Sequence, residues 1–172
     1  MTMLELPSVS GSQLYSDWSI PDLKRDIVET HRARQLGIPK GRRGVRVPTP
    51  VPEIGEVSVD GRLVSHPFLD KSRWDADHLR YGGPLTSASL RDPDEVNIMP
   101  ERLAGPYGDG RPESYAFLKA FMHGDRIVTV LVAVHREKRY VITSYRLETA
   151  ETEDRIDAER RLGVTIYTRL PH

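Results

Sequence analysis

The chain has 172 residues, of which 38% are hydrophobic and 29% are charged, and its 25 basic side chains balance its 25 acidic ones. This length suits one domain, or one domain with an extension, and the zero net charge argues against non-specific duplex binding driven by an overall basic field. The absence of cysteine excludes disulfides and thiolate metal sites. No apolar run is long enough to span a membrane and no signal peptide is visible, so we expect a cytoplasmic protein with no membrane partner.

Residues 1–52 are expected to form an extension that precedes the main domain. An N-capping serine, an early proline and a glycine just beyond the end predict a helix over residues 19–36. Every charged residue in 32–46 is basic, which indicates either a phosphate-contacting arm or a solvated linker. The Pro-rich residues 47–52 predict an extended linker. We therefore expect the main domain to cover residues 53–172.

The next part of the chain contains weaker signals. Residues 56–64 predict a β-hairpin around an Asp-Gly turn. Residues 87–96 predict a short helix or turn, and residues 99–103 predict another helical turn. Residues 104–112, rich in Gly and Pro, predict a loop.

Three β-rich runs over residues 115–145 predict an antiparallel meander, because short polar turns separate them. The runs are residues 115–122, 127–134 and 139–145. Beyond them, charged residues 148–161 predict an exposed helix and residues 164–168 a final strand. The expected fold is α+β: an N-terminal helix and linker, followed by a mainly antiparallel sheet of four to five strands flanked by helices.

The polar exceptions within this sheet are the first candidates for function. Lys119 shares one strand face with Tyr115, Phe117 and Phe121, and strand alternation puts Val141, Thr143 and Tyr145 on one face of the third run. Buried polar groups cost free energy unless they are satisfied, so such exceptions favour a functional site. Each also has a structural explanation, because a lysine stem can run along a sheet to water and Thr and Tyr are good strand residues.

Metal chemistry is one alternative. Imidazole and carboxylate side chains suit several divalent ions, and a possible set is His66, Asp70, Asp75, Asp77 and His78. Their spacing matches no strong template, and Asp75 and Asp77 can instead cap a helix. Nucleotide-binding loops, the Gly-x-Ser-x-Gly motif and His-Glu-x-x-His are absent. We therefore assign no metal and no cofactor.

Acid–base cleavage of RNA by its own 2′-hydroxyl is the other alternative, because it needs only a proton acceptor, a proton donor and groups that stabilise the phosphorane. The catalytic candidates are His78, Lys119, Thr143 and Tyr145. His78 can also be an ordinary histidine at a helix edge. His123 and His135 fall at turns, where we expect solvent exposure rather than catalysis.

A resemblance strengthens the second alternative. Four features follow one another along the chain: a histidine-bearing segment, the stretch Leu90-Arg-Asp-Pro-Asp-Glu-Val96, a meander with Lys119, and the strand Tyr140-Val-Ile-Thr-Ser-Tyr145. This order resembles the nuclease-like domains of the barnase–EndoU–colicin–RelE-like (BECR) superfamily, especially its phage-encoded branch. The resemblance covers residues 62–147. It implies helices followed by a four-stranded antiparallel sheet, and a toxin-like, metal-independent endoribonuclease.

The resemblance also implies roles for individual residues. His78 corresponds to the helix histidine that acts as acid or base, Lys119 to the basic residue of the first strand, and Thr143 with Tyr145 to the closing pair. A second histidine is common in the phage branch, but Arg80 and Tyr81 follow here, which leaves the general base open between His78, His66 and Arg80. The expected substrate-binding residues are Arg80, His66, Ser144 and Arg91.

The implied partners are RNA, with tRNA as one candidate, and an inhibitor or immunity protein; self-association into a homo-oligomer is also open. The rival hypothesis is a non-catalytic module of a phage or mobile element that binds another protein. Zero net charge and the acidic residues of 148–159 favour this rival, since a ribonuclease gains from a basic surface.

Overall fold

The computed structural model describes most of the sheet region and parts of the N-terminal third. The described residues are 6–9, 37–39, 41–60, 83–102, 104–105, 108–147 and 152–169. The expected helix over residues 19–36 lies outside them, as do His66, His78 and Arg80, so their placements remain predictions.

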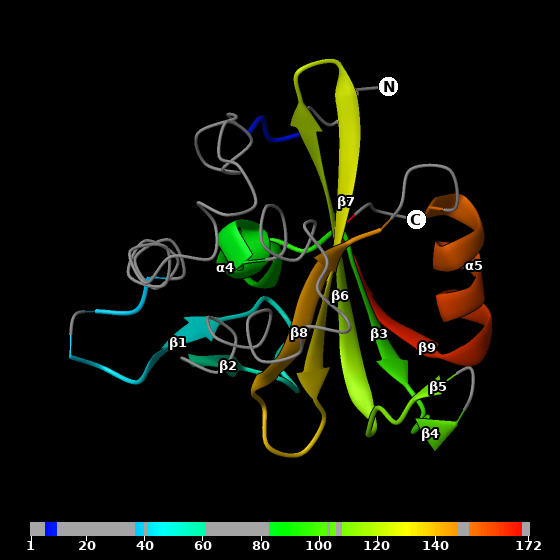
Figure 1. Ribbon diagram of the computed structural model, residues 1–172, viewed down its shortest axis with the longest axis horizontal. Helices are drawn as coiled ribbons and strands as arrows, with labels where there is room; N and C mark the ends of the chain where they lie inside the picture. Colours follow the sequence, from blue (N-terminus) through cyan, green and yellow to red (C-terminus); the bar gives the residue numbers. More distant parts are fainter. Residues whose placement is uncertain are drawn as a thin grey trace.

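A five-stranded sheet forms the centre, in the order β8–β7–β6–β3–β9, and all neighbouring strands are antiparallel (Figure 1). The strands are β3 (Glu95–Met99), β6 (Ser114–His123), β7 (Arg126–His135), β8 (Val141–Arg146) and β9 (Val164–Thr168). The predicted meander corresponds to β6, β7 and β8, and the predicted final strand to β9. The expected α+β class with a mainly antiparallel sheet is confirmed for the described residues.

One face of the sheet, here the first face, packs against α4 (Gly83–Arg91) and the hairpin of β1 (Gly44–Pro48) and β2 (Glu56–Asp60) (Figure 1). Alternate residues of β6 and β7 point toward it, because side chains alternate along a strand. Phe117 of β6 and its cross-strand partner Val132 are fully buried there. This face contains the main core.

The opposite face, here the second face, carries a smaller core and α5 (Thr152–Leu162). This core consists of Leu118, Leu131, Ala133 and Leu147, with Ile142 and Ile156 packed against it. The predicted charged helix is therefore confirmed as α5, and its Ile156 contributes to packing. The sheet lies between α4 on one side and α5 on the other (Figure 1).

The hairpin β1–β2 corrects one expectation. Val45 and Val47 of β1 lie opposite Val59 and Val57 of β2. Val47 and Val51 are buried in the same core as the first face of the sheet. The expected extended linker over residues 47–52 is therefore wrong, since alternating valines bury one side of a strand. The strand predicted at residues 56–60 is present as β2. Among the described residues it pairs with β1, which precedes it in the sequence, whereas the predicted hairpin placed its partner after it.

The junction between α4 and β3 corrects a second expectation. The helix ends at Arg91, and Glu95–Met99 forms β3 instead of continuing the helix or turn predicted over residues 87–96. Pro93 stands between the two elements, and proline disfavours a continuing helix. Met99 ends β3 rather than starting the helical turn predicted over residues 99–103. The expected loop contains two short paired strands, β4 (Ala104–Gly105) and β5 (Gly108–Asp109).

The strands β6 and β7 extend beyond the end of β3 as a two-stranded ribbon (Figure 1). Residues near the N-terminus pair with the freed edge of β6: Val9 N–H donates to the Met122 carbonyl and Met122 N–H to the Pro7 carbonyl, both at 2.9 Å. At the tip, Gly124 has a φ of 63°, a left-handed conformation that glycine adopts without strain.

Candidate functional site

Lys119 is held by carboxylates on the first face, where its side chain is 2% exposed. Its Nζ donates to Asp92 Oδ2 at 3.0 Å and to Asp94 Oδ1 at 3.2 Å. Arg169 Nη1 lies 3.3 Å from Asp92 and 3.6 Å from Asp94. Two cations and two carboxylates therefore balance, and the buried ammonium is paired with both carboxylates.

The loop between α4 and β3 supplies these carboxylates. Asp94 Oδ2 also accepts the backbone N–H of Ala120 at 2.8 Å, which fixes the loop against β6. This loop is part of the Leu90–Val96 stretch on which the resemblance depends. Its acidic residues thus account for Lys119 without any ligand, and we interpret Lys119 as a structural residue rather than a phosphate-binding one.

Lys119 and Thr143 lie on opposite faces of the sheet. Thr143 is the partner of Ala133 on β7, which is the partner of Ala116 on β6. Lys119 is an odd number of residues from Ala116, so alternation turns it to the other face. The expectation that Lys119 joins Thr143 and Tyr145 in one site is therefore wrong. Tyr145 occupies the backbone position two residues beyond Thr143 in β8.

A β-bulge interrupts the pairing of β7 with β8. Ala133 is paired with Thr143, whereas the next residue, Val134, is paired with Val141. Ile142 is the extra residue and directly precedes Thr143. The bulge places Val141 in the first-face core, contrary to the expectation that Val141 and Thr143 share a face. Bulges redirect side chains and are over-represented beside active sites.

Ser144 and Arg91 have environments that differ from each other. Thr86 Oγ1 of α4 donates to Ser144 Oγ at 2.8 Å, and both residues are buried. This hydrogen bond fastens α4 to β8, so the Ser144 hydroxyl lies inside the protein rather than at a substrate surface. Arg91 is exposed at the last residue of α4, where a cation complements the helix dipole.

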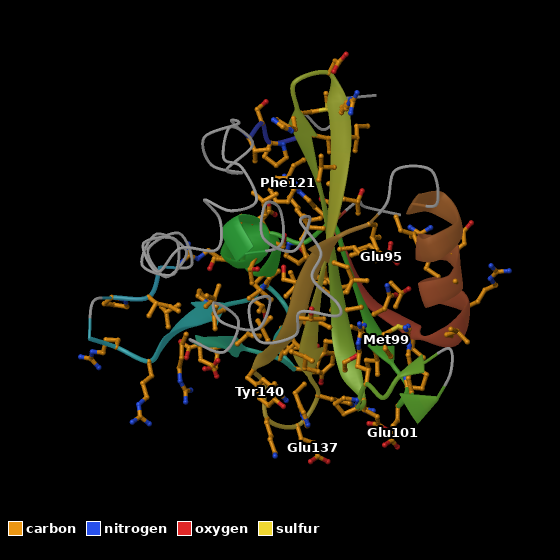
Figure 2. The ribbon with its side chains drawn as sticks, in the orientation of Figure 1. Glu95, Met99, Glu101, Phe121, Glu137 and Tyr140 are labelled. Carbon is orange, nitrogen blue, oxygen red and sulfur yellow. The ribbon has the colours of Figure 1, made fainter. Side chains whose placement is uncertain are left out.

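A second polar network, not expected from the sequence, joins α5 to the sheet. Glu95 of β3 is 8% exposed, and its two oxygens share the Arg160 Nε–H, at 2.9 and 3.1 Å, while Arg160 Nη2 donates to Oε2 at 2.7 Å. Asn97 Nδ2 donates to Glu95 at 3.0 Å, and Thr165 of β9 donates to Asn97. Figure 2 shows Glu95 between the sheet and α5.

The same contacts set the ionisation of Glu95. Burial alone raises the pKa of this carboxyl, but the hydrogen bonds from Arg160 and Asn97 and the charge of Arg160 outweigh burial and lower the pKa below its ordinary value. The pKa of Arg160 is raised, first by its hydrogen bonds to Glu95. Both groups are therefore charged near neutral pH.

His135, at the end of β7, is held in one orientation. Its Nδ1 accepts the backbone N–H groups of Glu137 and Lys138, each at 3.2 Å, and its ring centroid lies 5.2 Å from that of Tyr140. Tyr140 and Glu137 lie around the β7–β8 turn (Figure 2). A ring nitrogen that accepts hydrogen bonds carries no proton, so the neutral imidazole has its N–H at Nε2. His135 is half-buried, whereas the sequence led us to expect an exposed turn residue.

The described part of the chain contains neither a metal-ligand cluster nor a membrane-spanning helix. No group of three or more His, Asp or Glu side chains there could hold a metal ion, and the possible set from His66 to His78 lies outside that part. Among the described helices, none combines the length and apolar character needed to cross a membrane.

Comparisons of the chain with protein-family models, with curated proteins and with solved structures gave no significant match. The resemblance to the BECR superfamily therefore stays a prediction.

Proposed function

We propose that the protein is a metal-independent, ribonuclease-like enzyme that cleaves RNA, with tRNA as the first candidate substrate. The observation that carries the proposal is the β-bulge at Ile142, which directly precedes Thr143 and the Thr-x-Tyr pattern. In the resemblance, this pattern closes the phosphate site. A shared fold class does not identify an activity, so the proposal depends on this local geometry together with the histidine-bearing segment.

The proposed reaction is an attack of the 2′-oxygen on the neighbouring phosphorus. The 2′-hydroxyl proton passes to a base, the bond from phosphorus to the 5′-oxygen breaks, and an acid protonates the leaving oxygen. The products are a 2′,3′-cyclic phosphate and a 5′-hydroxyl. His78 serves as acid or base, with His66 or Arg80 as the second group, and Thr143 and Tyr145 donate hydrogen bonds to the phosphoryl oxygens.

The test is incubation of the purified protein with total tRNA in EDTA. Tyr145→Phe removes one proposed donor, so we expect cleavage to fall about 100-fold or more. Tyr140→Phe makes the same change at the residue directly before β8 and should leave the rate within a few-fold. His78→Ala should also abolish cleavage.

Two results would contradict the proposal. Cleavage in EDTA that survives both Tyr145→Phe and His78→Ala would place the chemistry elsewhere. Cleavage that disappears in EDTA and returns with a divalent ion would instead support the metal set from His66 to His78.

The rival function, a module that binds another protein, is favoured by one observation. Leu162 and Val164, at the corner between α5 and the edge strand β9, are 62% and 64% exposed. Exposed apolar side chains beside an open strand edge are typical of protein-binding surfaces. Light scattering of the wild type and of Val164→Lys tests this function: a dimer that dissociates in the variant, from a protein with no nuclease activity, would support it.

A further inference from the structure

We propose that β9 pairs with β9 of a second copy of this chain, antiparallel about a two-fold axis at Thr165, so that two five-stranded sheets join into one. The exposed corner at Leu162 and Val164 thereby gains one defined partner. This pairing does not depend on whether the protein cleaves RNA, and so it goes beyond the proposed function.

The edge of β9 differs from the other strand edges of the described structure, which are covered or protected at least in part. Residues 6–9 occupy the freed edge of β6, and β2 lies beside the residues that lead into β8, where Ser58 N–H donates to the Arg139 carbonyl at 2.7 Å. The edge strand β1 carries Arg46 and Pro48, which oppose further pairing. Among the described strands β9 has β3 as its only neighbour, and it contains neither a charged residue nor a proline. Unprotected edges of this kind pair with other chains.

The first half of β9 presents backbone hydrogen-bonding groups at the surface. Val164 is 64% exposed, and Thr165 is exposed as well. The Asp94 carbonyl accepts the Arg169 N–H at 2.9 Å, which sets the alternation of hydrogen bonds along β3. Counted along β3 to the far end of the ladder, this alternation directs the backbone groups of Val164 toward β3 and those of Thr165 toward the open side.

A two-fold axis at Thr165 brings complementary residues together. Thr165 forms two hydrogen bonds with its own copy, as each hydrogen-bonded pair of an antiparallel ladder does. Val164 then lies opposite Ile166 of the second copy. Both side chains are on the first face, because Val164 is the partner of Ile98, and Ile98 and Ile166 both pack against the main core. An exposed valine is thus covered by an apolar side chain of the second copy.

The helix α5 fits the same symmetry. It packs against both β3 and β9, and neighbouring strands are about 4.8 Å apart, so its axis lies about 5 Å from the proposed two-fold axis. The two copies of α5 therefore run antiparallel about 10 Å apart, which is the usual distance between packed helices.

The flanks of these two helices carry complementary charges. Ile156 packs on the second-face core, and Arg160 bonds to Glu95 of β3. A right-handed connection from β8 through α5 to β9, the hand of nearly all such connections, puts Asp157 and Arg161 on the flank nearer the open edge. Both are exposed, and the antiparallel arrangement sets Arg161 of each copy near Asp157 of the other. Exposed ion pairs add little affinity but fix orientation, which favours a second copy over an unrelated strand.

Sedimentation velocity of the full-length protein is the direct test, and we expect a reversible dimer. Thr165→Pro removes the outward N–H but leaves the ladder with β3, so the dissociation constant should rise about tenfold or more. Thr165→Val is the matched control. It loses the same hydroxyl and the hydrogen bond to Asn97 but keeps the N–H, so it should dimerise as the wild type does.

The register is tested with introduced cysteines, because the chain has none of its own. Val164→Cys mixed with Ile166→Cys should give a disulfide-linked heterodimer under mild oxidation, since opposed residues are within disulfide reach. Either variant alone places its two thiols on Cα atoms about 8 Å apart, beyond that reach, and should stay uncrosslinked. Ile127→Cys, 55% exposed and distant from β9, measures random oxidation.

Three results would overturn the dimer: a monomeric wild type, equal association of Thr165→Pro and Thr165→Val, or a cysteine mixture that crosslinks no faster than Ile127→Cys. The ribonuclease is judged separately. A monomer that cleaves tRNA would overturn the dimer and leave the proposed function standing, whereas a crosslinked dimer that never cleaves tRNA would support the dimer and contradict the ribonuclease.

Discussion

The buried ammonium of Lys119 stabilises the place where α4, β3 and the end of β9 meet. Asp92 and Asp94 bind it, and Arg169 binds the same two carboxylates. The backbone N–H of Arg169 also donates to the Asp94 carbonyl at 2.9 Å. One lysine therefore secures the loop after α4 against β6 and against the residue that follows β9.

Lys119→Met should lower the free energy of unfolding, because it leaves the two carboxylates with Arg169 as their only described cation. Loss of one partner from a buried pair costs about 3–5 kcal/mol. Asp92 is 55% exposed, so solvent reduces this cost and we expect about 2 kcal/mol. Urea denaturation measures the change.

The control is Lys138→Met at the exposed β7–β8 turn, which should alter stability by less than about 0.5 kcal/mol. At a temperature where Lys119→Met stays folded, its rate of tRNA cleavage should match that of the wild type. A large loss of rate at unchanged stability would return Lys119 to the catalytic site.

For single residues, strand alternation correctly predicted which face of the sheet Lys119 lies on, but it did not predict the carboxylates that bind Lys119. Asp92 and Asp94 are 27 and 25 residues away along the chain, and such distant ion pairs leave no periodic signal. The fixed orientation of His135 was also hidden in the sequence, because it depends on backbone N–H groups in a turn.

Among the elements, α5 is joined to the sheet by an ionic contact as well as by apolar packing. Ile156 is its described contribution to the second-face core, and Arg160 forms the hydrogen bonds to buried Glu95. The adjacent Arg161 is exposed, and its one hydrogen bond among the described residues is to the Asp157 carbonyl of its own helix. These neighbouring arginines form a matched pair for mutation.

Arg160→Ala should destabilise the protein by about 2–3 kcal/mol, since it leaves the Glu95 carboxylate buried without its cation. Arg161→Ala removes the same charge from the same helix and should cost less than about 0.5 kcal/mol. Thermal and urea unfolding of the two variants measure the difference. Equal losses would show that the charge of the helix matters rather than the contact with Glu95.

The lowered pKa of Glu95 predicts that the stability of the protein depends on pH. Its folded pKa is below the ordinary value of a glutamate carboxyl, so the folded state binds fewer protons than the unfolded state at acidic pH. Its contribution to stability is therefore present above about pH 4.5 and disappears as the pH falls through the lower folded pKa. Urea denaturation between pH 7 and pH 3 should show a smaller acid-induced loss for Glu95→Gln than for the wild type.

The sheet elements could be predicted from the sequence wherever β-branched residues alternate or run together, as in β6, β7 and β9. The predicted ends of helices and strands were wrong where a single residue decides where an element stops. Pro93 separates α4 from β3, and the bulge at Ile142 leaves no mark in composition. The strand β1 was missed because the prolines of residues 47–52 suggested a linker, whereas the valines of β1 pair with β2.

For the whole molecule, the sheet separates two environments. The first face contains the main core, α4, the β1–β2 hairpin and the Lys119 network, whereas the second face contains α5, Thr143, Ser114 and His135. The candidate residues expected in one site are divided between these faces. Of the described catalytic candidates, Lys119 therefore lies on the first face and Thr143 on the second.

The most direct test of this account is the chemical identity of the RNA ends after wild-type protein has acted on total tRNA in EDTA. Mass spectrometry of the fragments should find 2′,3′-cyclic phosphates and 5′-hydroxyls, which only attack by the neighbouring 2′-hydroxyl leaves. Intact tRNA, or fragments with 5′-phosphates and 3′-hydroxyls, would contradict the proposed ribonuclease.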